Sequence, residues 1–120
     1  MNMTVRKKIL VCDDDKRQRE SLQSILKYDY DVSTALNGQD ALDYLTLDPT
    51  FDLVLLDNNM PEMTGLEALP IIKKKFPHIK VVMISGDNIK NSSLELGALE
   101  FLSKPVDLKE MMEMLKGHLL

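Results

Sequence analysis

The sequence predicts an α/β fold in which a doubly wound, five-stranded parallel sheet is covered by helices on both faces. Two observations carry this prediction: five short apolar runs alternate with five segments of helical pattern, and several of the runs are apolar at consecutive positions. Strands that are buried on both faces of a parallel sheet have this continuous apolar character. Five successive strand–helix units therefore favour a parallel sheet with right-handed crossovers.

Strands and helices alternate along the chain. The predicted strands are short runs rich in apolar or β-branched residues, at 7–12, 31–35, 51–57, 80–85 and 100–103. The predicted helices follow them in order, at 16–28, 37–45, 64–76, 88–97 and 108–120. Because a helix separates every two strands, all five strands can run in the same direction.

The first two helices begin at polar residues that can cap a helix. Asp15 and Gln18 resemble a capping pair, and the apolar residues that follow them recur at helical spacing. A weaker strand, DVSTA, comes next, and Asn37 then caps the second helix.

The third strand and helix carry two unusual features. The strand FDLVLLD is apolar enough to be buried, yet it ends on the charged Asp57. Thr64 and Glu67 form a T-x-x-E capping box that opens the helix, and Pro70 lies well inside that helix. Because proline lacks an N–H and clashes with the preceding turn, we expect a kink or an early break at Pro70.

The last two helices differ in strength. The segment NIKNSSLELG is poor in strong helix formers and predicts at best a short helix. Asp107 and Glu110 cap the final helix, in which leucines and methionines form one apolar stripe. We interpret this Met-rich stripe as core packing rather than as a ligand site, because methionine fills irregular gaps in protein cores.

Composition and charge restrict the class of protein. The chain has 120 residues, 44% apolar and 28% charged, which fits one domain over 1–120, and we expect no output domain in it. The net charge of −4 offers no broad basic surface to nucleic acid or to an anionic membrane. We expect no signal peptide in residues 1–10 and no membrane span of roughly 20 apolar residues. With Cys12 as the one cysteine, no internal disulfide can form, and we expect a cytoplasmic location.

Charged and hydroxyl side chains follow four of the predicted strands. The first strand leads into Asp13 and Asp14, the third ends in Asp57, the fourth ends in Ser85, and the fifth leads into Lys104. Because ligands bind beyond the carboxyl ends of parallel strands, we expect these side chains in one crevice. If the first and third strands are neighbours, they lie about 5 Å apart, so their carboxylates would repel unless a cation lay between them. An open, oxygen-rich site of this kind suits Mg²⁺, which takes few protein ligands.

The segments ILVCDDD, DLVLLDNNMPEMTGLE, VVMIS and FLSKP resemble the receiver domain of bacterial two-component response regulators. The resemblance runs from about Lys8 to the C-terminus, and it implies the flavodoxin-like strand order 2-1-3-4-5. It also implies a phosphorylation-dependent switch: a regulatory domain rather than an enzyme, able to catalyse its own phosphorylation and dephosphorylation. Such a domain takes its phosphoryl group from a sensor histidine kinase or a phosphotransfer protein, and regulates a downstream protein as a monomer or weak dimer.

The resemblance implies a role for each matching residue. Asp57 corresponds to the phospho-acceptor, Asp14 to a direct Mg²⁺ ligand, and Asp13 to an acid that acts on the metal largely through water. Asn59 matches the position whose backbone carbonyl coordinates the metal, and Lys104 the lysine that contacts the phosphoryl group.

Three further residues match positions around the phosphoryl site. Ser85 corresponds to the hydroxyl that turns inward to bond the phosphoryl group, and Phe101 to the aromatic residue whose rotamer follows that hydroxyl. The resemblance also implies a cis bond before Pro105, an isomer that an X-Pro bond adopts at modest cost.

The pattern departs from the family in three places. The segment between Ser85 and Lys104 is shorter than usual by about three residues, close to one helical turn. Pro70 interrupts the third helix, and the loop after the phospho-acceptor is unusually rich in amides, at Asn58 and Asn59.

Three other functions fit the pattern less well. A phosphatase with an Asp nucleophile would commonly place a general acid two positions later, where this chain has Asn59. A flavin-binding module would want a Ser/Thr/Gly-rich phosphate loop after the first strand, where the sequence DDD would repel a phosphate. A degenerate receiver acting as an unphosphorylated binding module would not need the complete set of acidic, hydroxyl and lysine residues.

Overall fold

The computed structural model describes residues 5–120; residues 1–4, which begin the segment in which we expect no signal peptide, lie outside the described residues. Five parallel strands form one sheet in the order β2-β1-β3-β4-β5. The strands are β1 Lys8–Cys12, β2 Asp31–Ala35, β3 Leu53–Asp57, β4 Lys80–Ser85 and β5 Glu100–Ser103. The helices are α1 Lys16–Leu26, α2 Gly38–Leu47, α3 Gly65–Lys75, α4 Lys90–Glu95 and α5 Leu108–His118. The predicted fold class and strand order are therefore confirmed.

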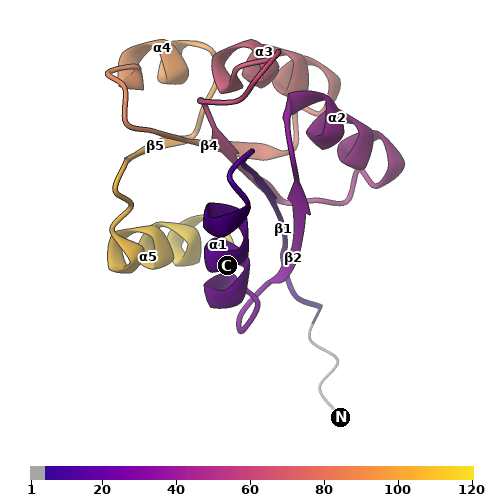
Figure 1. The fold of residues 1–120 in the computed structure, drawn as a ribbon. Helices are drawn as coiled ribbons and strands as arrows, with labels where there is room; N and C mark the ends of the chain where they lie inside the picture. The colour runs from indigo at the N-terminus through magenta and orange to yellow at the C-terminus, as the bar shows by residue number, and fades with distance from the viewer. Residues whose placement is uncertain (1–4) are drawn as a thin grey trace.

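Helices cover both faces of the sheet, and each face has its own core. Figure 1 shows α2, α3 and α4 on one side of the sheet and α1 and α5 on the other. In β3, Val54 and Leu56 belong to the core under α2 and α3, whereas Leu53 and Leu55 belong to the core under α1 and α5. Because successive side chains of a strand point to opposite faces, the continuous apolar run LVLL is what a strand covered on both sides requires.

The predicted helix caps form at four of the five helices. Asp15, Asn37 and Asp107 each accept a hydrogen bond from a backbone N–H in the first turn of α1, α2 and α5. Thr64 and Glu67 form the complete reciprocal capping box at α3. The predicted boundaries differ from the observed ones by up to two residues. At the third strand, for example, Phe51 belongs to the apolar run and enters the core, but β3 begins only at Leu53.

The expected early break at Pro70 is wrong, because α3 continues through Lys75. The missing N–H leaves the carbonyl of Leu66 without its usual intrahelical donor. Pro70 lies on the exposed side of the helix, where water can reach that carbonyl, and the buried residues Leu69 and Ile72 hold the helix on the sheet on both sides of the proline. Tertiary packing therefore outweighs the local cost of the proline.

Helix α4 is the short helix that the sequence predicts. It has six residues, and among the residues the structure describes no side chain caps its start. The chain leaves it through Gly97, whose φ of +105° lies in the region that glycine adopts without strain. Within residues 5–120, none of the helices is both long enough and apolar enough to span a membrane.

Candidate functional site

The strand order brings the predicted site residues to one edge of the sheet. β3 lies between β1 and β4, with Cys12 paired to Leu56 and Asp57 paired to Ile84. β4 in turn pairs with β5, so that the carboxyl ends of four strands meet. Parallel sheets form ligand crevices at this edge, beyond the ends of the strands.

Three aspartates from two strand ends form an acidic cluster. Asp13 and Asp14 follow β1 and Asp57 ends β3, and each offers one carboxylate oxygen within 4.8 Å of the others. Asp13 is 3% exposed and Asp57 is 2% exposed, whereas Asp14 lies at the surface. The cluster is thus open to solvent on the side of Asp14 and closed beneath the other two carboxylates.

Lys104 provides a positive charge at the cluster. Its Nζ lies 2.7 Å from Oδ1 of Asp57, and the Lys104–Pro105 bond is cis, as expected. Oδ1 is buried, and the ammonium of Lys104 is its one polar partner among the described residues. A buried carboxylate oxygen with unused acceptor capacity is suited to a cation or to a reacting group.

Burial raises the pKa values of both enclosed carboxyls. For Asp57, loss of water raises the pKa; the Lys104 ammonium and the backbone N–H of Asn59 act against this increase, and the charge of Asp14 adds to it. For Asp13, burial raises the pKa to about 6, opposed by the hydrogen bond from the Asp15 N–H and reinforced by the charge of Asp57. The ammonium of Lys104 therefore does not compensate for the burial of both carboxylates.

The chemistry of these donors fits a hard divalent cation such as Mg²⁺. The cluster consists of carboxylate oxygens, and it is open on the side of Asp14, so that a cation could keep part of its water. Asn59 lies two residues after Asp57, and its side chain is exposed. Its part as a ligand through the backbone carbonyl stays a prediction.

Ser85 and Phe101 lie on β4 and β5, the two strands that follow β3 across the sheet. Ser85 is fully buried at the end of β4, and its Oγ accepts a hydrogen bond from the backbone N–H of Asp87 at 3.0 Å. Its backbone carbonyl accepts from the N–H of Lys104 at 3.0 Å, which ties the lysine to the end of β4. Phe101 is half-buried on β5, in register with Met83. Their predicted movement on phosphorylation stays a prediction.

Two contacts at the site could not be read from the sequence pattern. Arg19 donates from Nη1 to the backbone carbonyl of Asp13 at 2.8 Å, and so holds the loop that carries two of the aspartates. The sequence held one weak signal for this contact, a basic residue in the first turns of α1. Helical side chains lean back toward the helix N-terminus, so such a residue can reach the loop before the helix. The second is Asn58, which is buried beside Asp57 and bonded to the start of α3.

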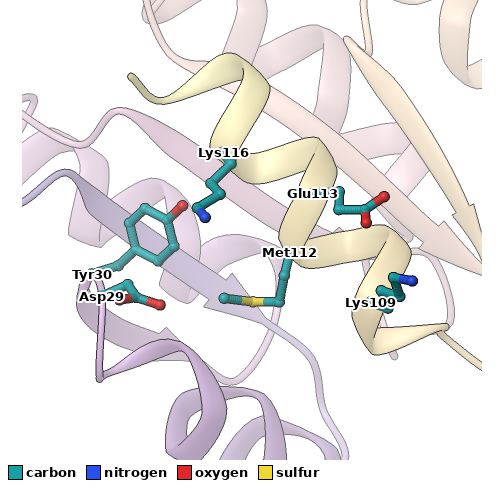
Figure 2. A pocket seen from close by; sticks show the side chains of 6 residues that line it. All are labelled: Asp29, Tyr30, Lys109, Met112, Glu113 and Lys116. Atoms are coloured by element: carbon teal, nitrogen blue, oxygen red, sulfur yellow. The ribbon is translucent and has the colours of Figure 1, made fainter.

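Two hollows differ in their relation to this site. A groove of about 580 Å³ adjoins it, lined by Asp13, Gln18, Ser21, Leu22, Ile84, Lys104, Pro105, Val106 and Leu108. Figure 2 shows the other, a pocket of about 350 Å³ between α5 and the turn before β2, lined by Asp29, Tyr30, Lys109, Met112, Glu113 and Lys116. Asp13 and Lys104 of the site line the first hollow, whereas the second is built from other parts of the chain.

Known proteins share this sequence pattern. The family model of the response regulator receiver domain matches residues 9–116. Transcriptional regulatory protein CrdR of Helicobacter pylori is 35% identical over 112 residues, covering 89% of this chain and 52% of that protein. The transcriptional regulatory protein CpxR homolog of Haemophilus influenzae is 38% identical over 116 residues, covering 93% of this chain and 50% of that protein. The chain thus spans about half the length of these relatives.

Solved structures share the fold over nearly the whole chain. Chemotaxis protein CheY4 of Vibrio cholerae superposes with a TM-score of 0.87 at 26% identity, covering 96% of this chain and 100% of that one. A CheY-like receiver domain protein of Methanospirillum hungatei gives a TM-score of 0.88 at 31% identity, covering 96% and 94% of the two chains. Together with the family match over residues 9–116, these similarities show that the chain belongs to the response regulator receiver domain family.

Proposed function

We propose that this chain is a phosphorylation-dependent signalling switch in which Asp57 accepts a phosphoryl group in a Mg²⁺-dependent reaction. The observation that carries the proposal is the buried Oδ1 of Asp57, which has the ammonium of Lys104 as its one polar partner among the described residues and lies in a cluster with two further carboxylates. A carboxylate oxygen of Asp57 attacks the phosphorus, and the bond from phosphorus to the donor breaks, its electron pair leaving with the donor. The product is an acyl phosphate, which is labile, as suits a signal that must decay.

The surrounding residues contribute position and charge rather than further covalent chemistry. Asp13 and Asp14, with Asp57 and the carbonyl of Asn59, would hold Mg²⁺. When bound, that cation offsets the negative charge of the carboxylates and of the phosphoryl oxygens. Lys104 contacts the phosphoryl group from the β5 side, and the hydroxyl of Ser85 turns to donate a hydrogen bond to it.

The proposed partners are those that membership of the receiver domain family implies. The donor is a sensor histidine kinase or a phosphotransfer protein, and the groove of about 580 Å³ that Asp13 and Lys104 line lies next to the site. The acceptor of the signal is a downstream protein, which the domain regulates in the cytoplasm as a monomer or weak dimer. The two relatives above are named transcriptional regulatory proteins. Control of transcription, through a downstream protein, is therefore one output that the domain could have.

The test is the intact mass of the protein after incubation with acetyl phosphate and Mg²⁺. The wild type should gain the mass of one phosphoryl group, and neither Asp57→Ala nor wild type in EDTA should gain it. Equal labelling of the wild type and Asp57→Ala would refute the assignment of Asp57. A wild type that never becomes labelled, even with a cognate kinase, would instead favour the binding module that acts without phosphorylation.

A further inference from the structure

Asn58, the residue after Asp57, is a buried amide that connects β3 to its neighbours. It is 9% exposed, and its backbone N–H donates to the carbonyl of Ile84 in β4 at 3.1 Å. Its own carbonyl accepts from the N–H of Met60 at 3.0 Å and from the N–H of Gly65 at 3.1 Å. One residue thus ties the end of the strand to β4, to the following loop and to the start of α3.

The side chain of Asn58 adds a fourth bond, which caps α3 from outside the helix. The first N–H groups of a helix lack intrahelical acceptors. In α3, the N–H of Leu66 donates to Oδ1 of Asn58 at 3.0 Å, and the N–H of Glu67 donates to Oγ1 of Thr64 at 3.2 Å. Asn58 therefore accepts hydrogen bonds from the N–H groups of Gly65 and Leu66, and Thr64 accepts the next one, from Glu67.

Helix α3 also lies directly against the peptide that joins Asp57 to Asn58. A Cβ atom on Gly65 would lie 2.6 Å from the carbonyl oxygen of Asp57 and 2.9 Å from Cα of Asn58. With β4 on one side and α3 in contact on another, this peptide cannot shift unless one of the two elements moves. The backbone from which the Asp57 carboxylate projects is consequently held in place by this attachment.

We infer that Asn58 is a positioning residue for the reaction at Asp57: its side chain fixes the strand end on α3 and so aims the carboxylate at its phosphoryl donor. The inference rests on the proposed function of Asp57. An amide suits the position because it accepts the Leu66 N–H without charge, whereas an aspartate would add a fourth carboxylate to the site. A residue with no acceptor would leave the N–H unbonded and the strand end free to move.

The experiment compares two variants that each remove one side-chain acceptor from the start of α3. Asn58→Ala removes the bond next to Asp57, and Thr64→Ala removes the bond to Glu67 and leaves Asp57 untouched. At saturating Mg²⁺, the maximal rate of labelling by acetyl phosphate should fall on the order of tenfold or more in Asn58→Ala, because small misplacements of reacting groups are costly. The concentration of acetyl phosphate that gives half the maximal rate should change little, and Thr64→Ala should keep the wild-type rate.

A conservative variant and its outcomes complete this comparison. Asn58→Asp keeps an acceptor for the Leu66 N–H but adds a fourth carboxylate to the site, so at saturating Mg²⁺ it should recover only part of the rate that Asn58→Ala loses. Equal slowing in Asn58→Ala and Thr64→Ala would show a general effect of helix capping and would overturn the inference. A wild-type rate in Asn58→Ala would overturn it as well.

A second readout separates this inference from the proposed function. In metal-free protein at one fixed pH, the ¹³C resonance of the Asp57 carboxyl should move in Asn58→Ala and stay in place in Thr64→Ala. If the wild type is never labelled, the proposed function fails, and this resonance still decides whether Asn58 positions Asp57: an unmoved signal rejects the inference. Should Asn58→Ala fail to fold, Asn58→Ser, whose shorter side chain draws the acceptor away from Leu66, replaces it with the same expected outcomes.

Discussion

Buried carboxylates dominate the physical chemistry at the scale of single residues. Asp13 and Asp57 are almost completely enclosed, and burial is the largest cause of the increase in pKa of each. Lys104 reduces this increase without cancelling it, so the folded, metal-free protein binds protons more readily at these groups than the unfolded chain does. Folding stability must therefore depend on pH at this site.

Asp13→Asn should remove part of that pH dependence. In the folded protein the pKa of Asp13 is about 6, against 3.8 for an exposed aspartate, so between these values the native state binds more protons. The free energy of unfolding in EDTA consequently falls as pH rises through this window, and the loss persists at higher pH. The variant keeps the acceptor for the Asp15 N–H but cannot titrate. The difference in free energy of unfolding, variant minus wild type, should therefore be greater at neutral pH than at acid pH by on the order of 3 kcal/mol. Denaturant unfolding across this range measures the difference, and parallel curves for the two proteins would contradict it.

Gly65→Ala should destabilise the protein even though alanine favours helices. The new Cβ would lie 2.6 Å from the Asp57 carbonyl oxygen, so α3 or the strand end must move, at a cost of about 1–3 kcal/mol. Gly117→Ala is the control. Gly117 lies in α5, and apart from its chain neighbours and the backbone of its own helix, no heavy atom of residues 5–120 lies within 4 Å of the added Cβ. That variant should be neutral or gain up to about 1 kcal/mol. Urea unfolding of both proteins measures these changes; equal effects would show that the contact at Gly65 is not restrictive.

At the scale of elements, local signals in the sequence specify helix starts better than helix ends. Asp15, Asn37, Thr64 and Asp107 cap helices as predicted, because a cap depends on residues that are close together in the sequence. Pro70 could not be judged in this way, because its tolerance depends on which side of α3 faces the sheet. Helix α4 was correctly expected to be short from its composition alone.

Residues 88–96 should exchange their amide hydrogens faster than α5. Helix α4 has six residues, Ser93 as its one buried member, and no side-chain cap among the described residues. Helix α5 has eleven residues, a cap from Asp107, and Met111 and Leu115 fully buried. Few buried contacts allow local opening at low free energy, so hydrogen exchange followed by mass spectrometry should separate the two segments. Equal protection would mean that α4 is held by contacts stronger than its burial indicates.

At the scale of the whole molecule, the site exists because the strand order brings distant segments together. The alternation of strands and helices, with polar residues at the strand ends, was sufficient to predict that Asp13, Asp14 and Asp57 gather at one edge. The contacts of Arg19 and Asn58 could not be predicted, because they depend on side-chain direction and on how closely α3 approaches β3. Such distances are set by packing across the fold, and no local pattern encodes them.

Metal-free Asp57→Asn should melt at a higher temperature than metal-free wild type. The substitution keeps the shape of the side chain and removes one of three crowded charges, and the half-buried ammonium of Lys104 can still be hydrated. Mg²⁺ should stabilise the wild type by roughly 2.7 kcal/mol at a hundredfold excess over its dissociation constant, and the variant by less. Thermal melts of both proteins in EDTA and in Mg²⁺ test this. A lower melting temperature for the metal-free variant, with equal shifts on adding Mg²⁺, would mean that the aspartates do not share a cation.

The central claim is that Asp57, among the three clustered aspartates, takes the phosphoryl group. Wild-type protein is treated with acetyl phosphate and Mg²⁺ and then with borohydride, which reduces an aspartyl phosphate to homoserine, and its peptides are sequenced by mass spectrometry. We predict homoserine at position 57 and intact aspartate at positions 13 and 14. Homoserine at position 13 or 14, or a labelled protein with intact aspartate at position 57, would contradict the claim.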